Sequence, residues 1–311
     1  MKYGIICAMQ EEIELLRADL TETAVTRIAG RDFCAGKLYG RDAVLVMSRI
    51  GKVASASTAT TLIDRYHPDC VIFCGTAGGV HKSLNVGDVV VGDRLVQHDF
   101  FTGVDYFRIP LLDVSYFKAD EALSSAMLKA VDHYMKYEMK QDIPKEYLDE
   151  FGIVSPKAQL GTIASGDQFI CDNEKNAWLA DHIENLQCVE MEGAAVAQIC
   201  YEFGIPFAVL RVISDSANSD SNRLPLYPRR TEGLSLQGRI TISSKRSRLS
   251  EKIGEPADYF RKKCRSHAEH RDHHTIYLLI AVGDEKRYFS DLIIDNSHFF
   301  IRHAELIQFC F

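Results

Sequence analysis

The stretch Cys70-Val71-Ile72-Phe73-Cys74-Gly75-Thr76-Ala77-Gly78-Gly79 joins five apolar residues to a glycine-rich segment. A short continuous apolar run bounded by glycine is typical of a strand that is buried on both faces. We therefore predict a strand over residues 70–74, followed by a tight turn or a ligand-binding loop over residues 75–79. The glycine spacing is neither GxGxxG nor GxxxxGK[ST], so it is weak evidence for a nucleotide phosphate site.

On both sides of this stretch, apolar strands alternate with helical segments. We predict strands over residues 3–8, 33–38, 43–48, 88–96, 159–165, 188–191 and 207–213. We predict helices over residues 10–20, 52–66, 120–137, 173–183 and 193–203. This alternation predicts an α/β fold in which helices cover both faces of a central sheet.

The segments that follow these strands are rich in carboxylates and small residues. They begin at Met9, Gly75, Ser165, Met191 and Ser214. Because ligands in α/β sheets bind beyond the carboxyl ends of the strands, we expect these segments to meet at one rim. Several carboxylates around one concave site favour proton transfer and hydroxyl recognition over anion binding.

Each of these residues also has a plain structural explanation. Glu12 and Glu192 can cap a helix or interact with its dipole, an effect of roughly 0.3–1 kcal/mol. Asp215 can form an Asx-turn, and Phe169 can be an ordinary core residue. Only the order and spacing of the segments together indicate chemistry.

Seven segments carry a family resemblance. They are GIICAMQEE at 4–12, SRIGKV at 48–53, GTAGG at 75–79, VGDVVV at 86–91, SGDQFI at 165–170, VEMEGAA at 189–195 and RVISD at 211–215. In this order they resemble the 5'-methylthioadenosine/S-adenosylhomocysteine nucleosidases, a branch of the nucleoside phosphorylase superfamily. The resemblance implies a three-layer αβα sandwich with a twisted mixed central sheet, nucleoside phosphorylase-like. It also implies N-glycosidic hydrolysis of both thioadenosines to adenine and a 5-thioribose product, with no cofactor and no metal.

The resemblance also implies roles for the matching residues. Asp215 is the implied general acid that protonates adenine N7, and Glu12 the implied base that deprotonates the attacking water. Glu192, with the main chain of Met191, is the implied clamp on the ribose hydroxyls. The other implied substrate contacts are Phe169 stacked on adenine, the Ile170 main chain, the apolar wall of Met9 and Ile50, and the rim residues Thr76, Ala77, Gly78, Glu190 and Ser214.

The first loop favours a hydrolase over a phosphorylase. A phosphorylase must hold a phosphate dianion, usually with arginines. Here the loop after the first strand offers Glu11 and Glu12 and no cation before Arg17. Two carboxylates suit water better than phosphate. Two alternatives stay open. One is a purine nucleoside phosphorylase or another adenine-nucleoside hydrolase of the same fold, and the other is a nucleoside-binding protein with impaired catalysis.

The chain changes character after Asn218. Residues 1–218 contain 20 Lys+Arg and 31 Asp+Glu, whereas residues 219–311 contain 16 and 12. We predict a catalytic domain over 1–218 that lacks the family's usual C-terminal lid and helix. We interpret 219–311 as an atypical tail of undetermined structure, from a shifted reading frame or a foreign sequence. Its histidine cluster at 267–274 is only compositional evidence for a metal, so none is predicted.

Composition limits the possible partners. A net charge of −7 argues against binding of nucleic acid, because general nucleic-acid-binding proteins have a basic surface. The apolar runs are far shorter than the ~18 residues of a membrane span, so no membrane partner is expected. Nine cysteines without a CxxC pair indicate reduced thiols and a cytoplasmic location. The resemblance implies a homodimer that uses residues 98–110, and residues 136–156 are expected to form a charged surface insertion.

Overall fold

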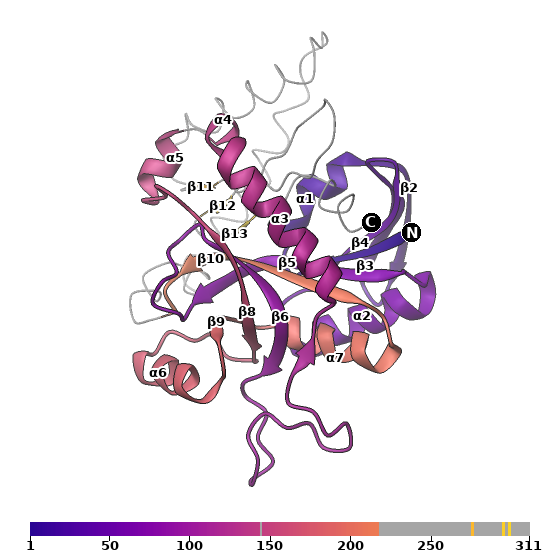
Figure 1. The fold of residues 1–311 in the computed structure, drawn as a ribbon. Helices are drawn as coiled ribbons and strands as arrows, with labels where there is room; N and C mark the ends of the chain where they lie inside the picture. The colour runs from indigo at the N-terminus through magenta and orange to yellow at the C-terminus, as the bar shows by residue number, and fades with distance from the viewer. Residues whose placement is uncertain (144, 218–274, 277–293, 296–297, 300–311) are drawn as a thin grey trace, which may run out of the picture.

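The computed structural model describes residues 1–143, 145–217, 275–276, 294–295 and 298–299 (Figure 1). The strands of its main sheet are β1 (Lys2–Cys7), β2 (Leu20–Ile28), β3 (Arg31–Leu38), β4 (Arg41–Met47), β5 (Cys70–Gly79), β6 (Val89–Gln97), β7 (Phe117–Lys118), β8 (Ala158–Ser165), β9 (Leu186–Glu190) and β10 (Phe207–Asp215). The helices are α1 (Gln10–Asp19), α2 (Lys52–Tyr66), α3 (Glu121–Tyr137), α4 (Met139–Asp142), α5 (Lys145–Glu150), α6 (Asn173–His182) and α7 (Gly193–Phe203). The predicted α/β class and the predicted mixed sheet are confirmed.

The main sheet runs in the order β10-β6-β8-β9-β5-β1-β4-β3-β2, and β7 pairs with β6. Strand β10 also pairs with β5, and β9 pairs with both β8 and β5. Five strands (β5, β10, β6, β8 and β9) therefore close on themselves. The parallel pairs β1–β4, β1–β5, β5–β10 and β6–β8 bring several carboxyl ends to one edge.

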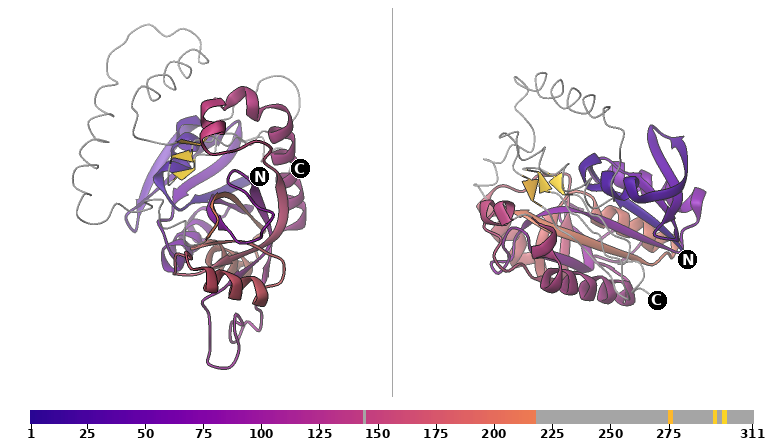
Figure 2. Two further views of the ribbon diagram at one scale, coloured as in Figure 1. Left: turned by 90° about the vertical axis from the view of Figure 1, so that its left-hand side faces the viewer. Right: turned by 90° about the horizontal axis from the view of Figure 1, so that it is seen from above.

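Two apolar clusters cover the two faces of the sheet. In β1, Tyr3, Ile5 and Cys7 pack with residues of α1 and α3, whereas Ile6 packs with residues of α2 and α7. This alternation follows from the two-residue period of a strand, which sends successive side chains to opposite faces. Figure 2 shows the resulting layers from two further directions.

The glycine-rich segment is part of a strand, so its predicted turn is wrong. Residues 75–78 continue β5 and pair with β10, with Gly75 opposite Arg211 and Gly78 opposite Asp215. Glycine is needed here because a Cβ on Gly75 would overlap the guanidinium of Arg211 and would lie 2.8 Å from Glu12 Oε1. The sequence therefore marks close packing of charged side chains against a backbone, rather than a change of direction.

The segment over residues 136–156 also differs from the prediction of a surface insertion. It forms the end of α3, then α4 and α5, and four of its apolar residues are buried in the core beneath α3. These residues are Met139, Ile143, Leu148 and Ile153. Spacings of four and five residues separate them, and this apolar side of the segment packs inward.

The described residues also include one strand that was not predicted and three short strands of the tail. Strand β2 was not predicted, because its burial pattern leaves only Leu20 buried and gives no apolar alternation. Most of the predicted tail, including the histidine cluster, lies outside the described residues. Its described residues form β11 (Thr275–Ile276), β12 (Ile294–Asp295) and β13 (His298–Phe299), a small antiparallel sheet. Within the described helices, none is long and apolar enough to cross a membrane.

We expect Met139→Ala to lower the free energy of unfolding by about 2–5 kcal/mol, because it leaves a cavity beside the core. Met139 is 1% exposed and the nearby Val154 is 80% exposed. The matched control, Val154→Ala, should change the free energy of unfolding by less than about 0.5 kcal/mol. Urea unfolding measures both, and equal effects would show that this segment does not pack as described.

Candidate active site

Contacts between distant segments bring the predicted rim together. The backbone N–H of Thr76 in β5 donates to Glu12, which follows β1. The N–H of Gly51, before α2, donates to Glu192 after β9. The Ser214 hydroxyl at the end of β10 lies 3.3 Å from the Ala77 carbonyl oxygen. The rim predicted from the strand ends is therefore present in the structure.

Glu12 lies in the first turn of α1 and is 1% exposed. Its Oε2 accepts the N–H groups of Ala8 at 2.8 Å and Met9 at 3.0 Å, and its Oε1 accepts that of Thr76 at 3.2 Å. Burial raises the pKa of Glu12 to about 7, although Arg211 and these three N–H groups act in the opposite direction. Glu12 therefore caps its helix, and its pKa lies in the range that suits a group that takes up a proton near neutral pH.

Arg211 is the central residue that sequence reasoning missed. It is 1% exposed, and its Nη2 donates to Glu190 and lies 4.0 Å from Glu192 Oε2. Burial lowers the pKa of Arg211, but the charges of Glu190, Glu192 and Glu12 outweigh burial and hold it above the usual value. A cation inside the otherwise apolar strand 207–213 was the available signal, since buried charges need partners.

Glu190 is bound entirely by groups of the protein. Its carboxylate accepts hydrogen bonds from the Ser165 hydroxyl, from Arg211 and from the N–H groups of Glu192 and Gly193. These bonds orient the guanidinium of Arg211 and the start of α7. The resemblance instead implies that Glu190 contacts the substrate.

Glu192 is the N-cap residue of α7, but its side chain makes no capping hydrogen bond. Instead, its Oε1 accepts the N–H of Gly51 at 2.8 Å. Burial raises the pKa of Glu192 to about 8, with a further contribution from the charge of Glu190 and an opposing one from Arg211. Capping therefore does not explain the position of this carboxyl.

Asp215 ends β10 and is 7% exposed. Its Oδ2 accepts from the Ser214 hydroxyl at 2.8 Å, and its Oδ1 accepts from the N–H of Ala217 at 2.7 Å. The second bond is an Asx-type turn, as the plain structural explanation anticipated. A Cβ on Gly78 would lie 3.1 Å from Asp215 Oδ1, so glycine leaves room for this carboxyl beside β5.

The other predicted contact residues lie on the same segments, with different exposure. Phe169 is 45% exposed, which argues against its being a core residue, whereas Ile170 is buried. Ile50 is 37% exposed. Met9, Thr76, Gly78, Met191 and Ser214 are half-buried, and Ala77 is buried.

A model described as the phosphorylase superfamily matches residues 2–228. A 5'-methylthioadenosine/S-adenosylhomocysteine nucleosidase of Bacillus thuringiensis (strain Al Hakam) is 39% identical over 225 residues, which are 71% of this chain and 89% of the relative. The chain belongs to this nucleosidase family. The residues that the superfamily model matches, 2–228, include all of the rim described above.

Solved structures agree with this membership. The nucleosidase of Colwellia psychrerythraea 34H, in complex with adenine, is 36% identical with a TM-score of 0.62, over 72% of this chain and 86% of that one. Futalosine hydrolase of Helicobacter pylori is 32% identical with a TM-score of 0.59, over 72% of this chain and 88% of that one. The nucleosidase fold is therefore shared by enzymes named for different substrates.

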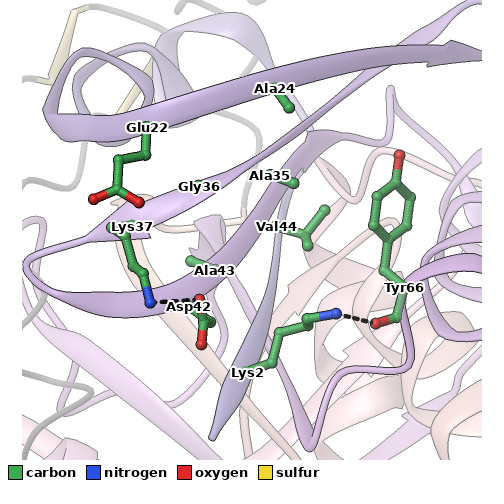
Figure 3. Close-up of a pocket in the computed structure, with 10 residues that line it drawn as sticks. All are labelled: Lys2, Glu22, Ala24, Ala35, Gly36, Lys37, Asp42, Ala43, Val44 and Tyr66. Atoms are coloured by element: carbon green, nitrogen blue, oxygen red, sulfur yellow. Dashed lines mark hydrogen bonds and ion pairs between the residues drawn. The ribbon is translucent and has the colours of Figure 1, made fainter.

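A cavity of about 250 Å³ lies away from this nucleosidase rim, at the β2–β4 side of the sheet (Figure 3). Two of its cations are already paired. Lys37 lies 2.8 Å from Asp42, and Lys2 donates to the Tyr66 carbonyl at 2.7 Å. None of the predicted site residues lines it. In the described part of the chain, no group of three or more His, Cys, Asp or Glu side chains is placed to hold a metal.

We expect Arg211→Met to lower the free energy of unfolding by about 3–5 kcal/mol at neutral pH, because it leaves Glu190 buried without its cation. The control is Arg94→Met, which breaks a 3.2 Å pair with Glu184, whose side chain is 76% exposed. That change should cost at most about 1 kcal/mol. Denaturant unfolding compares the two, and a loss below about 1 kcal/mol for Arg211→Met would contradict the role given to this pair.

Proposed function

We propose that this chain hydrolyses the N-glycosidic bond of 5'-methylthioadenosine and of S-adenosylhomocysteine, releasing adenine and the 5-thioribose product. The observation that carries the proposal is the group of buried carboxyls at one edge of the sheet: Glu12, Glu192 and Asp215. The relatives named for this activity support it, and so does the adenine complex of the Colwellia relative.

The proposed reaction divides the proton transfers between two carboxyls. Asp215 donates a proton to adenine N7, so that adenine leaves as a neutral base when the C1'–N9 bond breaks. Glu12 accepts a proton from the water that forms the new C1'–O bond. Glu192 in its carboxylate form accepts hydrogen bonds from the ribose hydroxyls and favours the positive charge that grows on the sugar.

Charge explains why water, rather than phosphate, is the proposed nucleophile. A phosphate dianion beside Glu12 and Glu192 would be repelled by both carboxylates. Arg211 does not supply a free phosphate site, because its Nη2 is bound to Glu190. A hydrolase for another nucleoside is the second candidate, favoured by the similarity to futalosine hydrolase. Turnover rates measured side by side on 5'-methylthioadenosine, S-adenosylhomocysteine and futalosine distinguish the candidates.

The proposed assembly is a homodimer. The segment between β6 and β7 projects from the body (Figures 1 and 2), and it exposes Phe101, Val104 and Tyr106. Exposed apolar side chains gathered on one segment are typical of a protein interface. Sedimentation equilibrium tests this, and a monomer at micromolar concentration would contradict it.

The proposed location is the cytoplasm, in the salvage of methionine. It is supported by the seven described cysteines, none of which forms a disulfide with another described cysteine. Fractionation of cells that express the chain tests the location.

The proposed catalytic unit spans residues 1–218, with 219–311 as a tail of different origin, and the change in charge supports this boundary. Sequencing of the coding DNA tests the origin of the tail. One unbroken frame shared by close relatives would contradict it.

We expect Glu12→Gln and Asp215→Asn each to reduce adenine release from 5'-methylthioadenosine by about 10²–10⁴-fold in phosphate-free buffer. Each change removes a proton acceptor or donor while keeping the side chain's shape. Glu14→Gln, an exposed carboxylate on the same helix as Glu12, is the matched control and should retain full turnover. Absorbance of released adenine measures all three, and unchanged turnover in Asp215→Asn would remove it from the mechanism.

The pH dependence follows from the raised pKa values of Glu12, about 7, and Glu192, about 8. Both carboxyls act in their ionised forms, so kcat/KM should fall as the pH is lowered through 8 to 7. An ordinary carboxyl would lose its charge only near its usual pKa of 4.5. A kcat/KM profile that stays flat down to about pH 5 would contradict the assignment of these two residues.

A further inference from the structure

Three charged residues outside the predicted site join two of its segments to the segment that follows β6. Lys52 Nζ lies 2.5 Å from Asp99 Oδ1, and Asp99 Oδ2 accepts the backbone N–H of Asp167 at 2.8 Å. Asp167 Oδ1 in turn accepts the backbone N–H of Lys52 at 2.8 Å. These contacts form a closed loop, which we call the bridge (Lys52, Asp99 and Asp167). Its members come from the start of α2 and from the segments after β6 and β8.

The bridge is more enclosed than a surface ion pair. The side chains of Lys52 and Asp99 are only 16% and 13% exposed. Burial raises the pKa of Asp99, but its bonds to Lys52 and to the N–H of Asp167 outweigh burial and leave it below the usual value. Lys52 Nζ also lies 3.1 Å from Gln97 Oε1. The carboxyl of Asp99 is therefore held in its ionised form. Both side chains are held by more than one contact, which favours a fixed geometry.

Each end of the bridge is directly connected to a substrate contact of the proposed function. Next to Lys52, the N–H of Gly51 donates to Glu192, the proposed ribose clamp. Asp167 lies two residues before Phe169, the proposed stacking partner of adenine. Gly51 has φ 99°, and a Cβ there would lie 3.2 Å from Asp167 Oδ1, so the approach of the two segments depends on glycine.

We propose that the bridge fixes the adenine-stacking segment relative to the ribose-binding carboxyl, and that Asp99 is a positioning residue for nucleoside binding. This inference rests on the proposed function, because it uses the roles of Phe169 and Glu192. Asp99 touches neither residue and acts through Asp167 and Lys52. Its effect is on the binding of the two halves of the nucleoside and not on proton transfer.

The test is a split between KM and kcat in Asp99→Ala. Loss of two hydrogen bonds to a charged group at a positioning site corresponds to a rise in KM for 5'-methylthioadenosine of about tenfold or more. Interactions made equally in the ground and transition states change KM and not kcat, so kcat should stay within about threefold. Asp99→Asn keeps one acceptor oxygen and should give an intermediate KM.

The matched control is Asp42→Asn, which breaks another Lys–Asp pair of 2.8 Å, between Lys37 and Asp42 on β3 and β4. It should leave KM unchanged. Lys52→Met should reproduce the rise in KM, and the double variant Lys52→Met/Asp99→Ala should raise it no further than either single change. Residues that act as one unit give such non-additive effects.

Adenine binding, measured by titration calorimetry, separates this inference from the proposed function. If the wild-type protein binds adenine but does not release it from nucleosides, the proposed hydrolysis is contradicted. In that case, weaker adenine binding by Asp99→Ala would still support the proposed role of the bridge. The bridge is overturned if folded Asp99→Ala or Asp99→Asn keeps wild-type KM and adenine affinity. It is also overturned if kcat falls while KM does not change. If Asp99→Ala does not fold, the same criteria apply to Asp99→Asn and Lys52→Met.

Discussion

The buried pair of Arg211 and Glu190 is the constraint on which the rest of the site depends. A guanidinium inside a sheet is tolerated only with partners that replace water, and here Glu190, Glu192 and Glu12 surround it. Glu190 also binds Ser165 and the first N–H groups of α7. One ion pair therefore fixes β8, β9, β10 and α7 relative to one another.

This constraint explains why glycine lies along β5. Gly75 faces Arg211 and Glu12, and Gly78 faces Asp215, so side chains at these positions would occupy the space of the charged groups. Because the carboxyls are buried, their protons are held more tightly, which places the pKa of Glu12 near neutrality. The same burial that costs stability brings the pKa of Glu12 close to the value that suits the base proposed for it.

Much of the fold was predictable because local patterns carry it. The helices Lys52–Tyr66 and Gly193–Phe203 have the predicted bounds. Strand β2 was missed because its exposed residues show no alternation of apolar and polar side chains. The glycine-rich end of β5 was missed because glycines have no side chains that could show such an alternation. In the site, the resemblance supplied Glu12, Glu192 and Asp215, but not Arg211 or the bridge. The bridge contacts join residues 47, 68 and 115 positions apart, and such separations leave no local signal.

In the proposed reaction, buried carboxyls organised by Arg211 direct water to the sugar carbon. Product analysis of 5'-methylthioadenosine turnover in saturating phosphate tests this most directly. Phosphorus NMR and mass spectrometry distinguish the two possible sugars. Free 5-methylthioribose should form at the same rate with and without phosphate. Formation of the sugar 1-phosphate, or a rate that requires phosphate, would contradict it.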